Sequence, residues 1–196
     1  MAFYMTGDPE ADGLLEREPL ALLIGMLLDQ QVPMEKAFHS PFDLENRLGG
    51  RLEAATIADA DPDELAAMFA ERPALHRFPA SMAGRTQQLC RHLVEHHRGQ
   101  AADVWTTATT GQELFANLKA LPGFGEQKAR IFTALLAKRM GVTPPGWEVV
   151  AGTYGQPGFF SVADIDGPDA LARVREHKRA TKAAAKATSG VTPPGG

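Results

Sequence analysis

The clearest pattern in the chain is an unbroken apolar run near its N-terminal end. Residues 20–28 contain no polar side chain, and Pro19 stands directly before them. A run of this length that follows a proline favours a buried helix over a strand. The run ends at Asp29-Gln30-Gln31, so these three residues are expected at the carboxyl end of the predicted helix.

Proline and capping signals predict the next two helices. Pro33 is a suitable first residue for a short helix over 34–39, and Pro41 is expected to interrupt the segment that follows. Asp61-Pro62-Asp63-Glu64 combines an N-cap acid, a proline at the first helical position and a glutamate three residues after the cap. This second helix is predicted to reach about Glu71.

Pro79 to Arg98 reads as a long helix with apolar residues on one face and a basic opposite face. His92 and His96 are four residues apart on that basic face and could ligate a metal. The glutamate that zinc proteases carry between two such histidines is missing. A solvated or phosphate-facing basic surface is therefore the favoured interpretation.

Two helices joined by a glycine-bearing turn are predicted in the second half of the chain. Residues 113–118 and 131–140 carry apolar side chains at helical spacing. The connecting segment Leu121-Pro122-Gly123-Phe124-Gly125-Glu126-Gln127-Lys128-Ala129 holds two glycines two positions apart, and Gly141 suits the end of the second helix. This pattern predicts a helix-hairpin-helix over about 112–140.

The chemistry of this turn suits a phosphate. Glycine allows positive φ and close approach of a ligand to the backbone. The start of the second helix offers unpaired N–H groups at the positive end of its dipole. Basic side chains follow at Lys128 and Arg130 and lie nearby at Lys119, Lys138 and Arg139. An ordinary αα-hairpin with a Pro-Gly connection is the alternative.

The composition changes after the hairpin. Residues 142–166 are rich in glycine and proline and hold Trp147 and Tyr154, aromatic groups that can stack on a base. A long loop in a compact chain is usually functional or mobile; alternatively, the two aromatic side chains only pin the loop to the core. A basic helix is predicted over 168–187, followed by a disordered tail over 188–196.

Composition and charge narrow the function classes. Tyr and Trp are scarce, which favours an all-α fold, and no stretch of 18 apolar residues or secretory leader is visible, so a cytoplasmic protein is expected. The single cysteine, Cys90, excludes an internal disulfide and a four-cysteine zinc or iron–sulfur site. The net charge is −4, yet residues 81–196 hold 14 basic against 9 acidic residues. Phosphate affinity depends on such local charge.

Taken in order, these features resemble the HhH-GPD superfamily of base-excision DNA glycosylases. The resemblance covers roughly 19–182 and is carried by the segments 22–31 and 121–129. It implies an all-α, two-lobed fold that lacks an iron–sulfur cluster. One lobe would comprise 18–141 and the other 1–17 with 142–187, and the substrate pocket would lie between them.

The resemblance also implies how DNA would be bound. In this family the hairpin grips phosphates through backbone N–H groups, often with a monovalent cation on hairpin carbonyls, here those of Leu121 and Gly123. A glutamine at the end of the first helix enters the gap left by a flipped base, and Gln31 matches that position; alternatively, Gln31 only hydrogen-bonds loose carbonyls. The DNA-binding residues implied are Gln30, Gln31, Leu121, Gly123, Gly125, Gln127, Lys128 and Arg130.

Bifunctional members of the family carry a nucleophilic lysine two places after the second hairpin glycine, where this chain has Gln127. Lys128 comes one residue late, and one residue rotates a helical side chain by about 100°, so Lys128 is expected to point away from the pocket. An amide forms no Schiff base. The chain thus resembles the monofunctional members, in which an activated water attacks the sugar.

Monofunctional members depend on an aspartate after the loop. Asp164 matches it, and Asp166 is the competing candidate. A carboxylate suits the role because breaking the N-glycosidic bond builds positive charge on the sugar of an extruded nucleotide. Alternatively, both acids are turn or capping residues. The base pocket would draw on Trp147 or Tyr154, with two adjoining residues, Phe159 and Phe160, as further candidates.

The resulting prediction is a nucleoid-associated base-excision glycosylase. It would act on double-stranded DNA, without lyase activity and without a side-chain metal site, and it would release a damaged or mismatched base with an Asp-assisted water. The alternatives are a non-catalytic helix-hairpin-helix protein that binds DNA, and a helical interaction protein with no DNA role.

Overall fold

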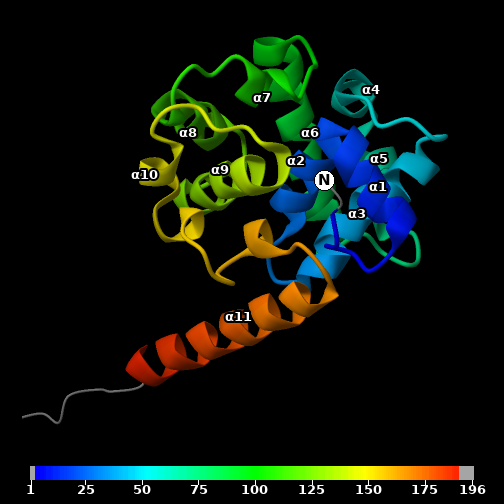
Figure 1. Ribbon diagram of the computed structural model, residues 1–196. Coiled ribbons are helices and arrows are strands. Elements are labelled where there is room, and N and C mark those ends of the chain that lie inside the picture. The colour runs from blue at the N-terminus through cyan, green and yellow to red at the C-terminus, as the bar shows by residue number, and fades with distance from the viewer. Residues whose placement is uncertain (1–2, 190–196) are drawn as a thin grey trace, which may run out of the picture.

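The computed structural model describes residues 3–189, and within that range it contains helices and no strand (Figure 1). The all-α class predicted from the sequence is confirmed for this part of the chain. The helices, with 3₁₀-helices written η, are α1 (Pro9–Arg17), α2 (Pro19–Leu28), α3 (Met34–Arg47), α4 (Ala54–Asp59), α5 (Pro62–Ala70), α6 (Pro79–His97), α7 (Asp103–Thr106), α8 (Gly111–Ala120), α9 (Glu126–Met140), α10 (Trp147–Ala151), η1 (Gly152–Gly155), η2 (Val162–Asp164) and α11 (Pro168–Ser189).

Helix α2 lies at the centre of the core, as its apolar run predicted. Every residue from Leu20 to Leu28 is buried. The carboxylate of Glu18 accepts a hydrogen bond from the Leu20 N–H at 3.1 Å and so caps the start of the helix. Gly25 lets α3 approach closely, because a Cβ there would lie 2.6 Å from the Phe38 ring. Burial of its side chains and the Glu18 cap therefore hold α2 in place up to its carboxyl end.

Helices α1, α3, α4, α5 and α6 form one half of the molecule (Figure 1). Helices α4 and α5 pack on α6, whereas α1 packs on α2 and α3. The predicted start of α5 is confirmed, because the Asp61 carboxylate accepts hydrogen bonds from the N–H groups of Asp63 and Glu64 at 2.9 and 3.1 Å. Helix α6 begins at Pro79 as predicted.

The other half of the molecule holds α7 to α10, and α8 and α9 form the predicted helix pair. Phe132 of α9 lies 6.0 Å from the Trp105 ring and 5.9 Å from the Phe124 ring, measured between centroids. Gly141 ends α9 in the left-handed conformation at φ 71°, as its position predicted. The core extends without interruption from this half into the first.

Two local predictions are corrected. Pro41 does not interrupt the helix that follows Pro33; it lies inside α3. The hydroxyl oxygen of the preceding Ser40 lies 2.7 Å from the carbonyl oxygens of both Lys36 and Leu75 and has one proton to share between them, which links this part of α3 to the segment before α6. Burial of the helix around Pro41 outweighs the lost backbone bond.

The segment 142–166 is also more structured than a loop. It contains α10, η1 and η2, which pack on α9, and α10 also packs on α8. This packing differs from the expected lobes, since the segment joins the hairpin half while α1 joins α2 and α3. The N-terminal segment does meet the start of α11, where Phe3, Tyr4 and Leu171 line one pocket.

Helix α11 leaves the body of the molecule and projects away from it (Figure 1). It runs to Ser189, slightly beyond the predicted end at residue 187. The expected disordered tail therefore begins inside α11, and its remainder, 190–196, lies outside the described residues. Among the described residues, no helix combines the length and the apolar character that crossing a membrane requires.

Candidate nucleic-acid interface

The hairpin turn is held by its apolar residues and exposes its glycines. Leu121 and Phe124 are buried, and the Phe124 N–H donates to the Leu121 carbonyl at 3.0 Å. Gly123 and Gly125 between and after them are exposed. Gly123 has φ +82°, and a Cβ there would lie 2.3 Å from the Leu27 side chain, so glycine is needed both for the backbone and for contact with α2.

The start of α9 presents backbone donors that this chain does not cap. Gly125 is the N-cap residue and provides no side-chain hydrogen bond. The N–H groups of the first three helical residues, Glu126 to Lys128, have no acceptor within the helix. The Glu126 carboxylate is turned along the helix, where it pairs with Arg130 at 2.9 Å, and this hydrogen bond lowers the pKa of Glu126. The arrangement can bind an anion.

The Lys128 ammonium group joins the hairpin to the end of α2. Its Nζ donates to the carbonyl oxygens of Met26 and Leu27 at 2.6 and 2.7 Å. Burial lowers the pKa of Lys128 to about 8, and Asp29 partly opposes the shift while Arg85 adds to it. Lys128 does not line the pocket that opens beside the start of α9. Its ammonium group is therefore used to hydrogen-bond the last carbonyls of α2 in this structure.

The two candidate glutamines differ in their surroundings. Gln30 is half-buried; its amide donates to the Leu27 carbonyl at 2.8 Å, and its own side-chain oxygen accepts from Arg85 at 3.2 Å. Gln31 is exposed and has the left-handed φ of 57°, which is uncommon for a residue with a side chain. Gln31 therefore projects from a fixed turn, whereas Gln30 secures that turn.

Phe78, an aromatic residue beside the Gln30-Gln31 turn, was not predicted from the sequence. Phe78 is 42% exposed, and the guanidinium of Arg77 lies 4.8 Å from its ring centroid. The Phe78 N–H donates to Nδ1 of buried His76 at 3.1 Å, and Nε2 of His76 lies 2.9 Å from the Gln30 carbonyl oxygen. The exposed pair thus lies next to the Gln30-Gln31 turn. The available signal was an aromatic residue between Arg77 and Pro79 in a polar stretch.

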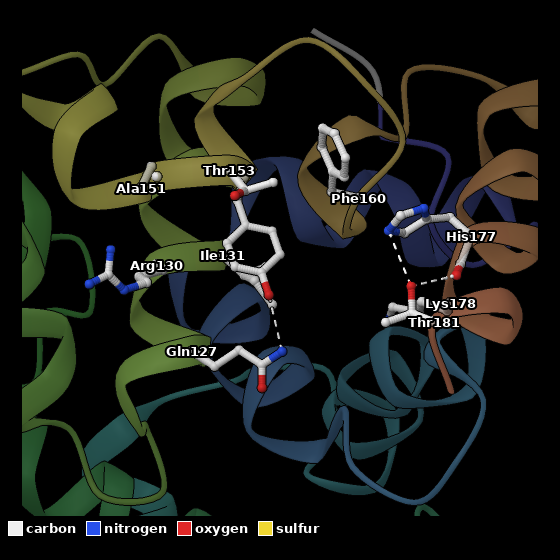
Figure 2. Close-up of a pocket in the computed structure, with 11 residues that line it drawn as sticks. Gln127, Arg130, Ile131, Ala151, Thr153, Phe160, His177, Lys178 and Thr181 are labelled. Carbon is white, nitrogen blue, oxygen red and sulfur yellow. Dashed lines mark hydrogen bonds between the residues drawn. The ribbon is translucent and has the colours of Figure 1, made fainter. Parts of the chain in front are cut away.

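A pocket of about 670 Å³ opens beside the start of α9 (Figure 2). The Gln127 amide faces it and donates to the Tyr154 hydroxyl at 3.0 Å. The pocket lies between α9, η1, Phe160 and the exposed face of α11, as Figure 2 shows. The lining residues are Gln127, Arg130, Ile131, Ala151, Gly152, Thr153, Tyr154, Phe160, His177, Lys178 and Thr181.

The aromatic candidates divide between pocket and support. Tyr154 and Phe160 line the pocket, whereas Trp147 and Phe159 do not. Trp147 packs against the core, and its backbone would clash with any Cβ at Gly111. The Phe159 ring lies 4.0 Å from the Arg173 guanidinium of α11. Arg130, a predicted DNA-binding residue, also donates to the Val150 carbonyl at 2.8 Å and supports α10.

Asp164 has partners for both of its carboxylate oxygens. Oδ1 lies 2.5 Å from the Lys138 Nζ, and Oδ2 accepts hydrogen bonds from the N–H groups of Phe160 and Ser161 at 2.8 and 3.0 Å. The side chain is only 3% exposed and does not line the pocket, although Phe160 does. Asp164 caps η2, which is the alternative role that the sequence left open. Asp166 is exposed and also lies outside the pocket lining.

No other element supplies an acid to the pocket lining among the described residues. Helix α10 follows Pro144-Pro145, and its N-cap residue is Gly146, which has φ +83° and no side-chain oxygen. The basic side chains in the pocket lining are Arg130, His177 and Lys178. These groups can attract an anion, and none of them is a carboxylate base.

In the part of the chain that the structure describes, no group of three or more His, Cys, Asp or Glu side chains is placed so that it could hold a metal ion. The rings of His92 and His96 lie 4.4 Å apart, and burial, followed by the charge of His96, lowers the pKa of His92. Cys90 is buried, which raises the pKa of its thiol to about 12. The Leu121 carbonyl keeps one lone pair beside its turn hydrogen bond, and the monovalent cation there stays a prediction.

The chain matches no protein-family model, no curated protein and no solved structure.

Proposed function

We propose that the chain binds double-stranded DNA through the hairpin turn and the Gln31 turn, and that it does so without cleaving the DNA. The observation that carries the proposal is the uncapped, exposed start of α9 next to Gly123 and Gly125. Backbone N–H groups at a helix start bind phosphate in any sequence context. The proposal therefore concerns the DNA backbone first.

A second contact supports a duplex as the partner. Gln31 projects from the end of α2, and Lys128 connects this end to the hairpin through two hydrogen bonds. Two exposed features are thereby held at a fixed spacing, as phosphate and base contacts on one duplex require. Phe78 and Arg77 extend the same surface and can stack on an unpaired base.

The state of Asp164 is the reason for placing binding before catalysis. A catalytic carboxylate must reach the substrate or its attacking water. Both oxygens of Asp164 are engaged within the protein, and its side chain is almost completely buried. This supports the non-catalytic alternative over the Asp-assisted hydrolysis that the family resemblance implied.

Monofunctional DNA glycosylase activity is the second candidate, because the pocket adjoins the hairpin and is large enough for an extruded base. Strand scission by alkali after incubation with alkylated, oxidised or deaminated duplexes tests it. An abasic product that Asp164→Asn abolishes and Asp166→Asn preserves would favour this candidate over binding alone. Borohydride trapping should give no adduct, since Gln127 has no amine.

The decisive test of DNA binding uses a variant that blocks the hairpin amides and leaves the stability of the fold almost unchanged. In Gly125→Asp the new carboxylate would cap α9 at a site with no atom within 4 Å of the new Cβ, so stability should change by only about a few tenths of a kcal/mol. The same carboxylate would occupy the amides and repel phosphate. We expect duplex affinity, measured by fluorescence anisotropy, to fall by about tenfold or more.

Ala55→Asp is the matched control, because it adds the same charge to the first turn of α4, at an exposed position in the other half of the molecule (Figure 1). Its affinity should equal that of the wild type. Equal affinity of Gly125→Asp and wild type, with both folded by circular dichroism, would remove the hairpin from the interface. Failure of the wild type to bind any duplex, including one with an abasic-site analogue, would favour a helical interaction protein instead.

A further inference from the structure

Helix α11 is exposed along most of its described length. Val174 is buried, and every residue from Arg175 to Thr181 is exposed. Beyond Val174 the only apolar residues in the sequence of the helix are alanines, so the sequence provides no large apolar side chain for a protein groove or a lipid surface to cover. Its projection from the body (Figure 1) therefore calls for a partner of another kind.

The charge of α11 indicates the chemistry of that partner. Residues 173–181 contain Arg173, Arg175, Lys178 and Arg179 against one acid, Glu176, and no acidic residue follows in the sequence. Cations spaced along an exposed helix suit a polyanion whose charges repeat along a line, such as a nucleic-acid backbone. The chain is acidic overall, so this local excess is a separate feature of α11.

The first exposed turns of α11 lie against the loop that presents Gln31. Arg175 forms an ion pair with Glu35, and the Lys178 Nζ lies 3.5 Å from the Asp29 carboxylate. Asp29 and Glu35 stand on either side of Gln31 in the sequence, and both would repel a phosphate at that turn. The two cations of α11 offset this repulsion.

The same face of α11 also borders the pocket. His177, Lys178 and Thr181 line one side of it, and Gln127 lines the side formed by α9 (Figure 2). The His177 ring lies 5.3 Å from the Phe160 ring in an edge-on arrangement, which fixes the start of the exposed segment to the pocket wall. The helix thus leaves the body beside the proposed DNA surface.

We propose that α11 is a second DNA-contacting element; this inference rests on the proposed function of the hairpin. Arg175 and Lys178 neutralise the carboxylates beside Gln31, and Arg179, one residue further along the exposed helix, contacts backbone phosphates. A helix rises 1.5 Å per residue, so the described part beyond Val174 follows roughly 20 Å of a duplex. The contact is independent of base sequence.

The salt dependence of binding tests the direct contact. Arg179→Gln keeps the helix, since glutamine and arginine have similar helix propensities. Loss of one phosphate contact should lower the slope of log K against log salt by about 0.9 and weaken duplex binding about threefold to tenfold at fixed salt. Arg51→Gln is the matched control, because Arg51 is also an exposed arginine and is paired only with Glu53 on the first half of the molecule; its slope should not change.

A double-mutant cycle tests the neutralising role of Arg175. Arg175→Gln should weaken binding about threefold or more, because it leaves the Glu35 charge facing phosphate. Glu35→Gln in the same chain should restore affinity to near the wild-type value. If Arg175 acts only by anchoring α11 through its ion pair with Glu35, the double variant, which also lacks that pair, should bind as weakly as the single one.

The outcomes separate the two proposals. If the wild type binds duplex DNA, Gly125→Asp does not, and the α11 variants bind with wild-type affinity and slope, the role of α11 is overturned and the hairpin proposal stands. If the wild type binds no duplex at low salt, the proposed function fails and α11 has no DNA to contact. A lower slope for Arg179→Gln with an unchanged Arg51→Gln supports the proposal.

Discussion

The hairpin turn (121–125) and the segment that contains Asp164 (156–166) were both predicted to carry function, and they differ in how their polar groups are paired. The hairpin leaves the first N–H groups of α9 uncapped and exposed beside two glycines. In the second segment, Lys138 and two backbone N–H groups occupy the Asp164 carboxylate. Open donors can bind a ligand, whereas a paired and buried carboxylate stabilises the protein that contains it.

The turn has backbone donors available for a ligand, whereas Asp164 is used to support the structure around it. Gly123 and Gly125 permit a ligand to approach the backbone, because neither carries a side chain. Asp164 instead caps η2 and accepts a hydrogen bond from the N–H of Phe160, and Phe160 in turn forms part of the pocket wall. A residue type that suits catalysis is thus not sufficient; its remaining hydrogen-bonding capacity decides what it can do.

The largest effect should come from removing the partner of Asp164. Lys138→Met leaves a carboxylate that is 3% exposed without its counter-charge, and we expect a loss of about 3 kcal/mol in the free energy of unfolding, measured by urea denaturation. Lys119→Met, at an exposed position, should change it by about 0.5 kcal/mol or less. A loss below about 1 kcal/mol for Lys138→Met would show that the ion pair matters little and would reopen a catalytic role for Asp164.

An intermediate effect is expected where the hairpin meets α2. Lys128→Met removes the donor from two carbonyls at the end of α2, and we expect a loss of about 1–3 kcal/mol in the free energy of unfolding. Because this link positions Gln31 relative to the hairpin, duplex affinity should fall as well. Unchanged affinity in the folded variant would show that the two exposed features act separately.

The same lysine predicts a dependence on pH. Burial lowers its pKa to about 8 in the folded chain, from an ordinary value of 10.5, so between these values the unfolded chain binds the proton more strongly. The contribution of Lys128 to the free energy of unfolding should therefore increase as the pH rises from about 8 to about 10.5. Urea denaturation across this window should show the increase in the wild type, and a smaller one in Lys128→Met.

The smallest effect should be that of Asp164→Asn on DNA affinity. The amide keeps an oxygen that can accept from the Phe160 and Ser161 N–H groups, so the pocket wall should persist while the ion pair with Lys138 is lost. Duplex affinity should stay within about twofold of the wild type, since Asp164 pairs with Lys138 in the last turn of α9 and the hairpin amides are in the first. A larger change, with the fold intact, would place this acid in the interface and contradict a purely structural role for Asp164.

Local signals predicted most helices correctly because each depends on neighbours in the sequence. The apolar run of α2, the Asp61-Pro62 start of α5 and the glycine that ends α9 all act within a few residues. Pro41 was misjudged because its cost is local while the burial that offsets it is tertiary. The short helices in 142–166 were missed for a similar reason: α10 and η2 are held by packing on α9.

The candidate site was predictable only in part. The two hairpin glycines were singled out from their spacing and Gln31 from the family resemblance, and Gln127 and Tyr154 do line one pocket. The contacts of Lys128 with α2 join residues about a hundred positions apart, and no local pattern announces them. The position of Phe78 beside the Gln30-Gln31 turn was likewise not predictable, since it depends on the contact between His76 and the Gln30 carbonyl.

The amino-acid sequence by itself determined that this chain is helical, that α2 is buried and that a glycine-bearing turn precedes α9. Helix formation, capping and turn geometry are properties of short segments, so the residues within them suffice. Only the tertiary structure decided which polar groups remain available. The N–H groups at α9 stay open because nothing packs over Gly125, whereas Lys138 reaches Asp164 across 26 positions and occupies it.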